Sequence, residues 1–119
     1  MKAVMFHLSL AVLVAAGINA PAAAQGPIGT VEPGRYQCEL PGDAAGPRGV
    51  VQEEAGFRID GASRYSSGQG AGTYLRRGNV LTFTSGVRSG ERYQVVSPGF
   101  LRKIEDGKAG RLRCVRQER

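Results

Sequence analysis

Residues 72–85 read GTYLRRGNVLTFTS and predict a β-hairpin. Two short runs rich in threonine, aromatic and aliphatic side chains flank a Gly-Asn pair at 78–79, and such a pair suits a two-residue hairpin turn. This turn places Tyr74 opposite Phe83. Because side chains alternate between the two faces of a strand, Tyr74, Leu81 and Phe83 share one face, which we assign to the core.

Short strands of the same kind are expected along the rest of the chain. The candidates alternate apolar and polar residues between turn-forming Gly, Pro and Asp-Gly residues, and they cover 35–40, 50–59, 92–96, 100–104 and 112–115. The Ser- and Gly-rich residues 61–72 are expected to be flexible. No segment after residue 24 shows a sustained helical period of apolar residues. The pattern therefore predicts an all-β fold, a small antiparallel β-barrel or sandwich of about six to eight short strands.

The first 24 residues are typical of a cleaved signal peptide. Lys2 supplies a positive charge, residues 3–17 are almost continuously apolar, and residues 22–24 are alanines that form a small-residue cleavage pattern. The apolar run is shorter than the roughly 20 residues that span a membrane, so we expect no membrane span after cleavage. The mature protein is then periplasmic or secreted, with a flexible leader at 25–33 and a single β-domain at 34–119.

The chain has two cysteines, Cys38 in the first strand candidate and Cys114 in the last. In an exported protein paired thiols persist as disulfides, and the absence of a Cys-x-x-Cys motif disfavours a redox role. A Cys38–Cys114 bridge would tie together the two ends of the sheet. On the chain-entropy model, closing so long a loop stabilises the fold by about 4–5 kcal/mol.

The residues that several catalytic mechanisms require are missing from the predicted mature chain. The only histidine, His7, lies in the signal segment, which leaves the mature chain without Ser-His or Cys-His pairs and without imidazole ligands for zinc. Glu53 and Glu54 are adjacent and would point to opposite faces of a strand, so they do not form a carboxylate pair. We therefore expect a non-catalytic protein with no cofactor and no metal site.

Charge points to an anionic partner. The chain has 16 Lys and Arg against 10 Asp and Glu, a net charge of +6, and thirteen of the cations are arginine. Arginine pairs in a planar, bidentate way with carboxylates and phosphates. The partner expected is an anionic envelope component or a protein with an acidic surface. Nucleic acid would also satisfy the charge, but an exported compartment disfavours it. The alternative is a basic surface that serves solubility alone.

The last two strand candidates form a second predicted hairpin around Asp106-Gly107. A two-residue turn there places Ile104 opposite Ala109 and Arg102 opposite Arg111. By the same pairing Leu101 opposes Leu112 and Phe100 opposes Arg113. One face then carries Leu101, Leu112 and Cys114 and belongs to the core.

The other face of this hairpin is the candidate binding site. Two arginines directly opposite each other repel, and an anionic ligand would relieve that repulsion. Phe100 beside Arg113 could add a stacking contact. The alternative is a solvated basic face on which the arginines splay apart. The candidate anion-binding residues are Arg102, Arg111, Arg113 and, nearby, Arg116.

Four stretches of the chain carry a resemblance: GRYQC at 34–38, GTY at 72–74, LTFTSG at 81–86 and LRCVR at 112–116. Together they resemble a group of small exported bacterial proteins of unknown function, some of which carry the label elongation factor P. Such a factor is a larger cytosolic protein of several β-barrel domains, so its activity is not carried over to this chain.

A second set of residues, Tyr36-Gln37-Cys38, Ser67-Gly68 and Tyr74, is similar to the layout of the periplasmic lysozyme inhibitors. Those proteins are small disulfide-tied β-barrels that insert a Ser-Gly loop into the lysozyme cleft. The resemblance implies an alternative function, inhibition of a periplasmic or secreted hydrolase such as lysozyme, through a protruding loop at 66–74. The primary prediction remains an exported, non-catalytic binding or structural module, and the sequence leaves its oligomeric state open.

Overall fold

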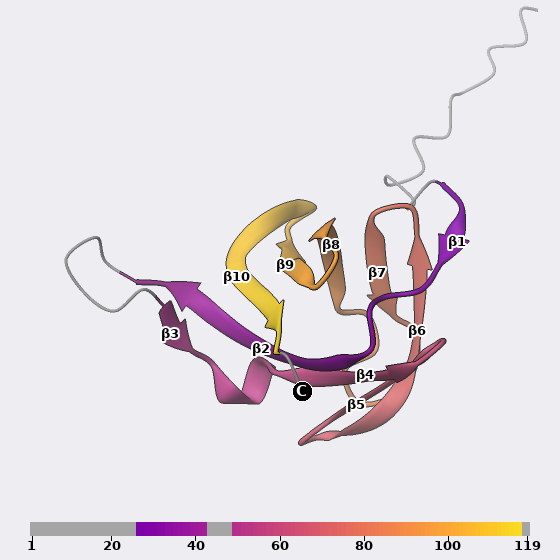
Figure 1. The fold of residues 1–119 in the computed structure, drawn as a ribbon, viewed down its shortest axis with the longest axis horizontal. Coiled ribbons are helices and arrows are strands. Elements are labelled where there is room, and N and C mark those ends of the chain that lie inside the picture. The colour runs from indigo at the N-terminus through magenta and orange to yellow at the C-terminus, as the bar shows by residue number, and fades with distance from the viewer. Residues whose placement is uncertain (1–25, 43–48, 118–119) are drawn as a thin grey trace, which may run out of the picture.

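The computed structural model describes residues 26–42 and 49–117 (Figure 1). Their elements are, in chain order, β1 (Ile28–Gly29), β2 (Gly34–Pro41), β3 (Gly49–Val51), the single-turn 3-10 helix η1 (Glu53–Ala55), β4 (Phe57–Gly61), β5 (Arg64–Ser67), β6 (Gly70–Arg77), β7 (Val80–Phe83), β8 (Arg92–Ser97), β9 (Phe100–Glu105) and β10 (Lys108–Arg116). The predicted signal peptide lies outside the described residues. Within those ranges, no helix has the length and apolar character needed to cross a membrane.

Eight of the strands form a closed antiparallel barrel, which confirms the predicted all-β fold and selects the barrel over the sandwich. From β4 to β10 each strand pairs with the next along the chain, β2 pairs with β4, and β10 returns to pair with β2 and closes the ring. β1 and β3 stand outside the ring, paired with β6 and with the end of β2. In Figure 1 the β2–β3 ribbon extends away from the barrel.

The hairpin predicted at 72–85 is present as β6 and β7, with Tyr74 opposite Phe83 as expected. The flexible stretch predicted at 61–72 is wrong, because β5 and the start of β6 form a hairpin there and Tyr65 pairs with Gly72. The Tyr65 ring is buried in the barrel. A Cβ on Gly72 would clash with the Ser85 carbonyl oxygen and would lie 2.8 Å from the Tyr65 ring. The small residues of this segment, from which flexibility was predicted, therefore allow neighbouring strands and the Tyr65 ring to pack closely.

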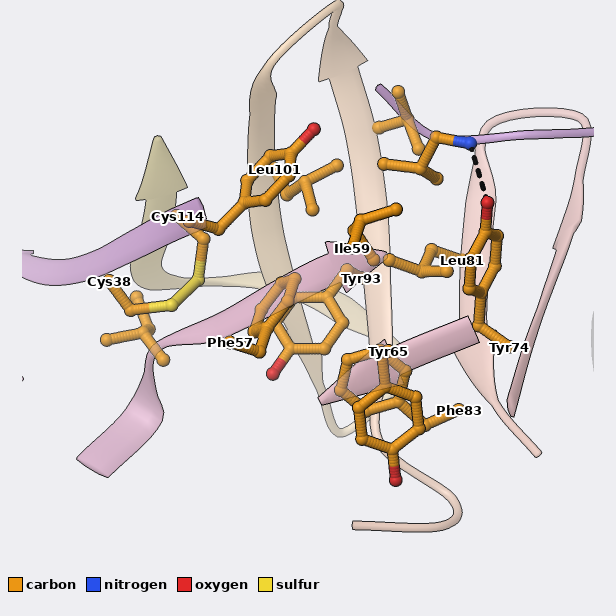
Figure 2. Close-up of a cluster of buried hydrophobic side chains, with 14 residues drawn as sticks. Cys38, Phe57, Ile59, Tyr65, Tyr74, Leu81, Phe83, Tyr93, Leu101 and Cys114 are labelled. Atoms are coloured by element: carbon orange, nitrogen blue, oxygen red, sulfur yellow. Dashed lines mark hydrogen bonds between the residues drawn. A yellow bond between two sulfur atoms is a disulfide. The ribbon is translucent and has the colours of Figure 1, made fainter. Parts of the chain in front are cut away.

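Aromatic rings fill the barrel (Figure 2). Tyr65 stacks on Phe83 at 3.9 Å between ring centroids, and Phe57 meets Phe83 edge-on at 5.2 Å. Tyr36 and Tyr93 pack against Phe57 from other strands. An eight-stranded barrel is just wide enough for side chains to fill or for one small ligand. Here the aromatic side chains fill the interior, so the barrel contains a packed core.

The disulfide predicted between Cys38 and Cys114 is present. The two cysteines are direct register partners on β2 and β10, the first and last strands of the ring, and both are fully buried. The bridge therefore crosslinks the seam at which the barrel closes.

The N-terminal segment closes one end of the barrel. Val31 is 3% exposed, and its backbone N–H donates a 3.1 Å hydrogen bond to the Tyr74 hydroxyl. Figure 2 shows this bond beside the core. The Arg76 guanidinium donates to the Thr30 carbonyl at 2.8 Å, and β1 pairs with the end of β6. Residues 28–33, expected as part of a flexible leader, are thus an ordered strap across the barrel mouth.

Candidate functional site

The β9–β10 hairpin turns at Asp106-Gly107 as predicted, and Ile104 opposes Ala109. Beyond that pair the predicted register is wrong. Arg102 opposes Arg113, where Arg111 was expected, because a bulge between Ala109 and Arg113 places two extra residues on β10.

Phe100 accordingly opposes Val115, and not Arg113. The face assignment survives the shift: Leu101, Leu112 and Cys114 are all buried. Side chains alternate with a period of two, so a two-residue shift returns each of them to its original face.

The outer wall of β8, β9 and β10 collects three of the four candidate arginines. They line one surface cavity of about 350 Å³, together with apolar and amide side chains. No acidic residue lines it among the described residues. The full lining is Pro41, Gln94, Val96, Phe100, Arg102, Arg111 and Arg113.

The three arginines differ in how they are held. Arg102 donates two hydrogen bonds to the Gly110 carbonyl in the bulge, from Nη2 at 2.7 Å and from Nε at 3.1 Å. Arg113 donates from Nε to Glu39 Oε1 at 2.8 Å across the β2–β10 pair. Arg111 is exposed, and within residues 26–42 and 49–117 nothing accepts a hydrogen bond from its side chain. The cavity thus has two anchored guanidinium groups and one that is available.

The fourth candidate, Arg116, is not part of this cluster. Its Nε donates to the Pro33 carbonyl at 2.6 Å, which fastens the end of β10 to the N-terminal strap. It lines a neighbouring cavity that also contains Glu32, Phe100 and Val115. Arg116 is therefore a contact between the two chain ends of the barrel.

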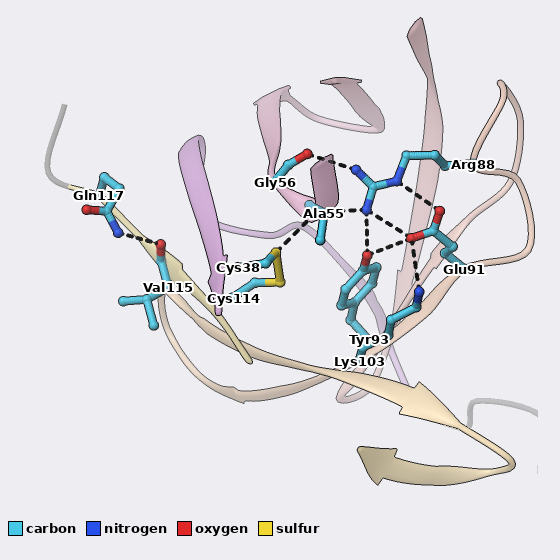
Figure 3. Close-up of a disulfide and its surroundings, with 10 residues drawn as sticks. All are labelled: Cys38, Ala55, Gly56, Arg88, Glu91, Tyr93, Lys103, Cys114, Val115 and Gln117. Atoms are coloured by element: carbon cyan, nitrogen blue, oxygen red, sulfur yellow. Dashed lines mark hydrogen bonds and ion pairs between the residues drawn. A yellow bond between two sulfur atoms is a disulfide. The ribbon is translucent and has the colours of Figure 1, made fainter. Parts of the chain in front are cut away.

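A fifth arginine, Arg88, was missed by the sequence reading and is the most fully bonded cation of the described residues (Figure 3). It is 8% exposed and makes a bidentate pair with Glu91, from Nε at 2.8 Å and from Nη2 at 2.9 Å. It also donates to the carbonyls of Gly56 and Ala55 and to the Tyr93 hydroxyl. Because Arg88 lies in a turn with no alternating pattern, the sequence contained no signal for its burial.

The charges of this network stabilise one another. Burial works to raise the pKa of Glu91, but hydrogen bonds from Arg88 and Tyr93 and the charges of Arg88 and Lys103 outweigh it and hold that pKa below its usual value. Burial raises the pKa of Tyr93. No buried side-chain nitrogen or oxygen of the described residues lacks a partner. The network is complete without a ligand, so we read it as the latch that ties the β7–β8 loop to η1.

The other candidate sites of the described residues give weaker support for ligand binding. A cavity of about 410 Å³ beside η1 holds Arg35 and Arg58, but Glu53 also lines it and Asp60 lies 3.4 Å from Arg58. Its charge is therefore largely offset. In the part of the chain that the structure describes, no cluster of three His, Cys, Asp or Glu residues could hold a metal ion.

The segment 66–74, expected as a protruding loop, belongs to the β5–β6 hairpin and turns tightly at Gly68 and Gln69. Ser67 Oγ donates to the Gly70 carbonyl, and the Gln69 side chain donates to the Glu54 carbonyl. The turn is thus held against η1.

Comparisons of the chain with protein-family models, with curated proteins and with solved structures found no match. The two family resemblances described above therefore stay predictions.

Proposed function

We propose that this chain is an exported, non-catalytic binding module that holds an anionic partner on the outer wall of β8, β9 and β10. The observation that carries the proposal is the convergence of Arg102, Arg111 and Arg113 on one cavity whose described lining contains no acidic residue. Glu39, bonded to Arg113, is the carboxylate that adjoins it.

Electrostatics favour an anion at this cavity. Arg102 and Arg113 are direct register partners on neighbouring strands, and like charges in that position destabilise the pair. Glu39 offsets one of the charges, and the exposed Arg111 adds another. Guanidinium forks match the planar oxygen pairs of carboxylates and phosphates. A bound anion would therefore neutralise charge that residues 26–42 and 49–117 leave in excess at this wall.

The lining residues suit binding better than catalysis. Arginine stays protonated and cannot act as a general base, while Phe100, Val96 and Pro41 offer no nucleophile. The buried Cys38–Cys114 disulfide is compatible with an oxidising compartment, as the predicted signal peptide at 1–24 requires. We therefore propose a partner in the envelope: an anionic component of it or an acidic protein surface.

The test is a titration of the purified protein with two soluble anions, glycerol phosphate and polygalacturonate, followed by amide NMR shifts at low and at high salt. We expect shifts centred on residues 102, 111 and 113, and weaker binding at high salt. Arg102→Gln with Arg111→Gln should weaken binding by about tenfold or more. Arg64→Gln, the same substitution at one exposed arginine of β5, should leave it unchanged. Absence of binding by both anions, or equal loss in the β5 control, would overturn the proposal.

A further inference from the structure

The outer wall that carries the arginines also carries an apolar row. Phe100 on β9 opposes Val115 on β10, and Val96 lies beside them on β8, where Ser97 pairs with Phe100. Val96 points outward because Val95 is buried, and it is 49% exposed. One outward position further along the strands, Arg102 pairs with Gln94 on one side and with Arg113 on the other. The apolar row and the basic row therefore run in parallel, about 7 Å apart.

The cavities follow this division. The lining of the arginine-lined cavity, of about 350 Å³, also includes Val96 and Phe100 of the apolar row. A second cavity, of about 520 Å³, shares Phe100 with it and continues past Val115. An apolar path along Phe100 and Val115 thus leads from the basic cavity into the second one, which Glu32 and Arg116 also line. A soluble acidic sugar or a free phosphate would leave this path uncovered.

We infer that the wall binds an anionic amphiphile, with its phosphate or carboxylate head on the basic row and its hydrocarbon chain along Val96, Phe100 and Val115. The inference rests on the proposed function and narrows its partner from any anion to a lipid-like one. The chain must lie on the outside of the barrel, because aromatic rings fill the interior and Val31 closes one mouth. Each methylene covered should tighten binding by about threefold to fourfold.

The experiment separates the head from the chain. The protein, purified as its host produces it, is titrated with dihexanoyl phosphatidylglycerol below its micelle concentration, with glycerol phosphate as the head alone, and with dihexanoyl phosphatidylcholine as the zwitterionic lipid. We expect the phosphatidylglycerol to bind about tenfold or more tightly than either of the others. NMR shifts should include residues 96, 100 and 115 only for the lipid probe.

Matched variants test the apolar row. Val115→Thr lies in the apolar row but outside the arginine-lined cavity, and it keeps the size and the β-branching of the side chain. It should remove much of the lipid's advantage while leaving glycerol phosphate binding unchanged. Val50→Thr, the same change at an exposed valine of β3, should alter neither. Amide spectra of both variants check that the fold is kept.

The outcomes distinguish the two proposals. If glycerol phosphate binds at the arginines as tightly as the lipid, or if the β3 control loses lipid binding equally, the amphiphile inference is overturned and the proposed function stands. If both lipids bind equally, the basic row selects no head group and the inference is overturned as well. If glycerol phosphate and polygalacturonate both fail to bind, the proposed function is overturned, and the amphiphile inference that rests on it is overturned with it.

Discussion

Arg88 and Arg111 have the same side chain in opposite environments, one buried and hydrogen-bonded and the other exposed. Arg88 lies inside one end of the barrel, where a carboxylate, two carbonyls and a phenol accept its hydrogen bonds and the rings of Phe57 and Phe83 lie 5.5 and 5.6 Å from its guanidinium carbon. Arg111 stands on the outer wall, and none of the described residues accepts a hydrogen bond from it. The comparison shows that an arginine is structural or available according to how many of its five donors the fold already uses.

On the proposed function, one of the two regions serves the stability of the fold and the other serves ligand binding. The latch around Arg88 and the strap around Val31 lie at the ends of a barrel whose interior is filled. The outer wall carries more positive charge than its neighbours among the described residues offset. Changes at the latch should therefore alter unfolding and spare ligand binding, and changes on the wall should do the reverse.

The largest expected effect is at the latch. Arg88→Met leaves the Glu91 carboxylate without its guanidinium partner and should cost about 3–5 kcal/mol of unfolding free energy, measured by urea denaturation. Arg64→Met, at an exposed position on β5, should stay within about 0.5 kcal/mol of the wild type. Adding Glu91→Met to Arg88→Met should recover part of the loss. Equal costs at positions 88 and 64 would show that the latch does not hold the fold.

Alkaline pH should produce the second-largest loss of stability. Burial raises the pKa of Tyr36 to about 12, and it also raises the pKa of Tyr93. Because the unfolded chain releases these protons near pH 10, the stability is complete below pH 10 and is lost as the pH rises through the folded values. Ionisation of Tyr36 and Tyr93 should therefore accompany the loss of the near-ultraviolet circular dichroism. Tyr36→Phe should reduce the pH dependence of stability, and ionisation of Tyr36 and Tyr93 near pH 10 in the folded protein would contradict the prediction.

Acid should have a smaller effect on stability, because Glu91, the carboxyl whose pKa the fold lowers, is partly exposed. The pKa of Glu91 is lowered in the fold, so the folded state binds fewer protons than the unfolded chain below about pH 4.5. Its contribution is present above that pH and is lost as the pH falls through the lowered value. Urea midpoints measured from neutral to acid pH should fall, and Glu91→Gln should flatten the curve. An unchanged slope in that variant would assign the acid sensitivity to other carboxylates.

The smallest effect on stability should accompany a large effect on binding. Arg111→Gln removes an exposed charge with no partner among the described residues and should change the unfolding free energy by less than about 0.5 kcal/mol. The same variant should weaken glycerol phosphate binding severalfold, measured by titration against Arg64→Gln. A loss of stability with unchanged binding would reverse the comparison between the two regions.

Register and burial were predictable to different depths. The Gly-Asn turn at 78–79 was enough to give the β6–β7 pairing, because a two-residue turn sets the register of its own strands. The Asp106-Gly107 turn was equally recognisable, but the bulge that follows on β10 moved Arg102 from Arg111 to Arg113. The bulge lets β10 bend so that the ring closes on β2. The residues of the local turn do not determine that bend, so they could not predict the bulge.

The sequence by itself determined the strand character of the chain, the inward face of each clear strand and the pairing of its two cysteines. These follow from alternation, from turn residues and from having only two thiols, all of which are local or countable. Tertiary structure alone decided that the sheet closes as a barrel, that Arg88 is buried, and that Arg102, Arg111 and Arg113 share a cavity without Arg116. Those outcomes depend on which strands far apart in the chain become neighbours, and on which carbonyls and carboxylates each guanidinium then meets.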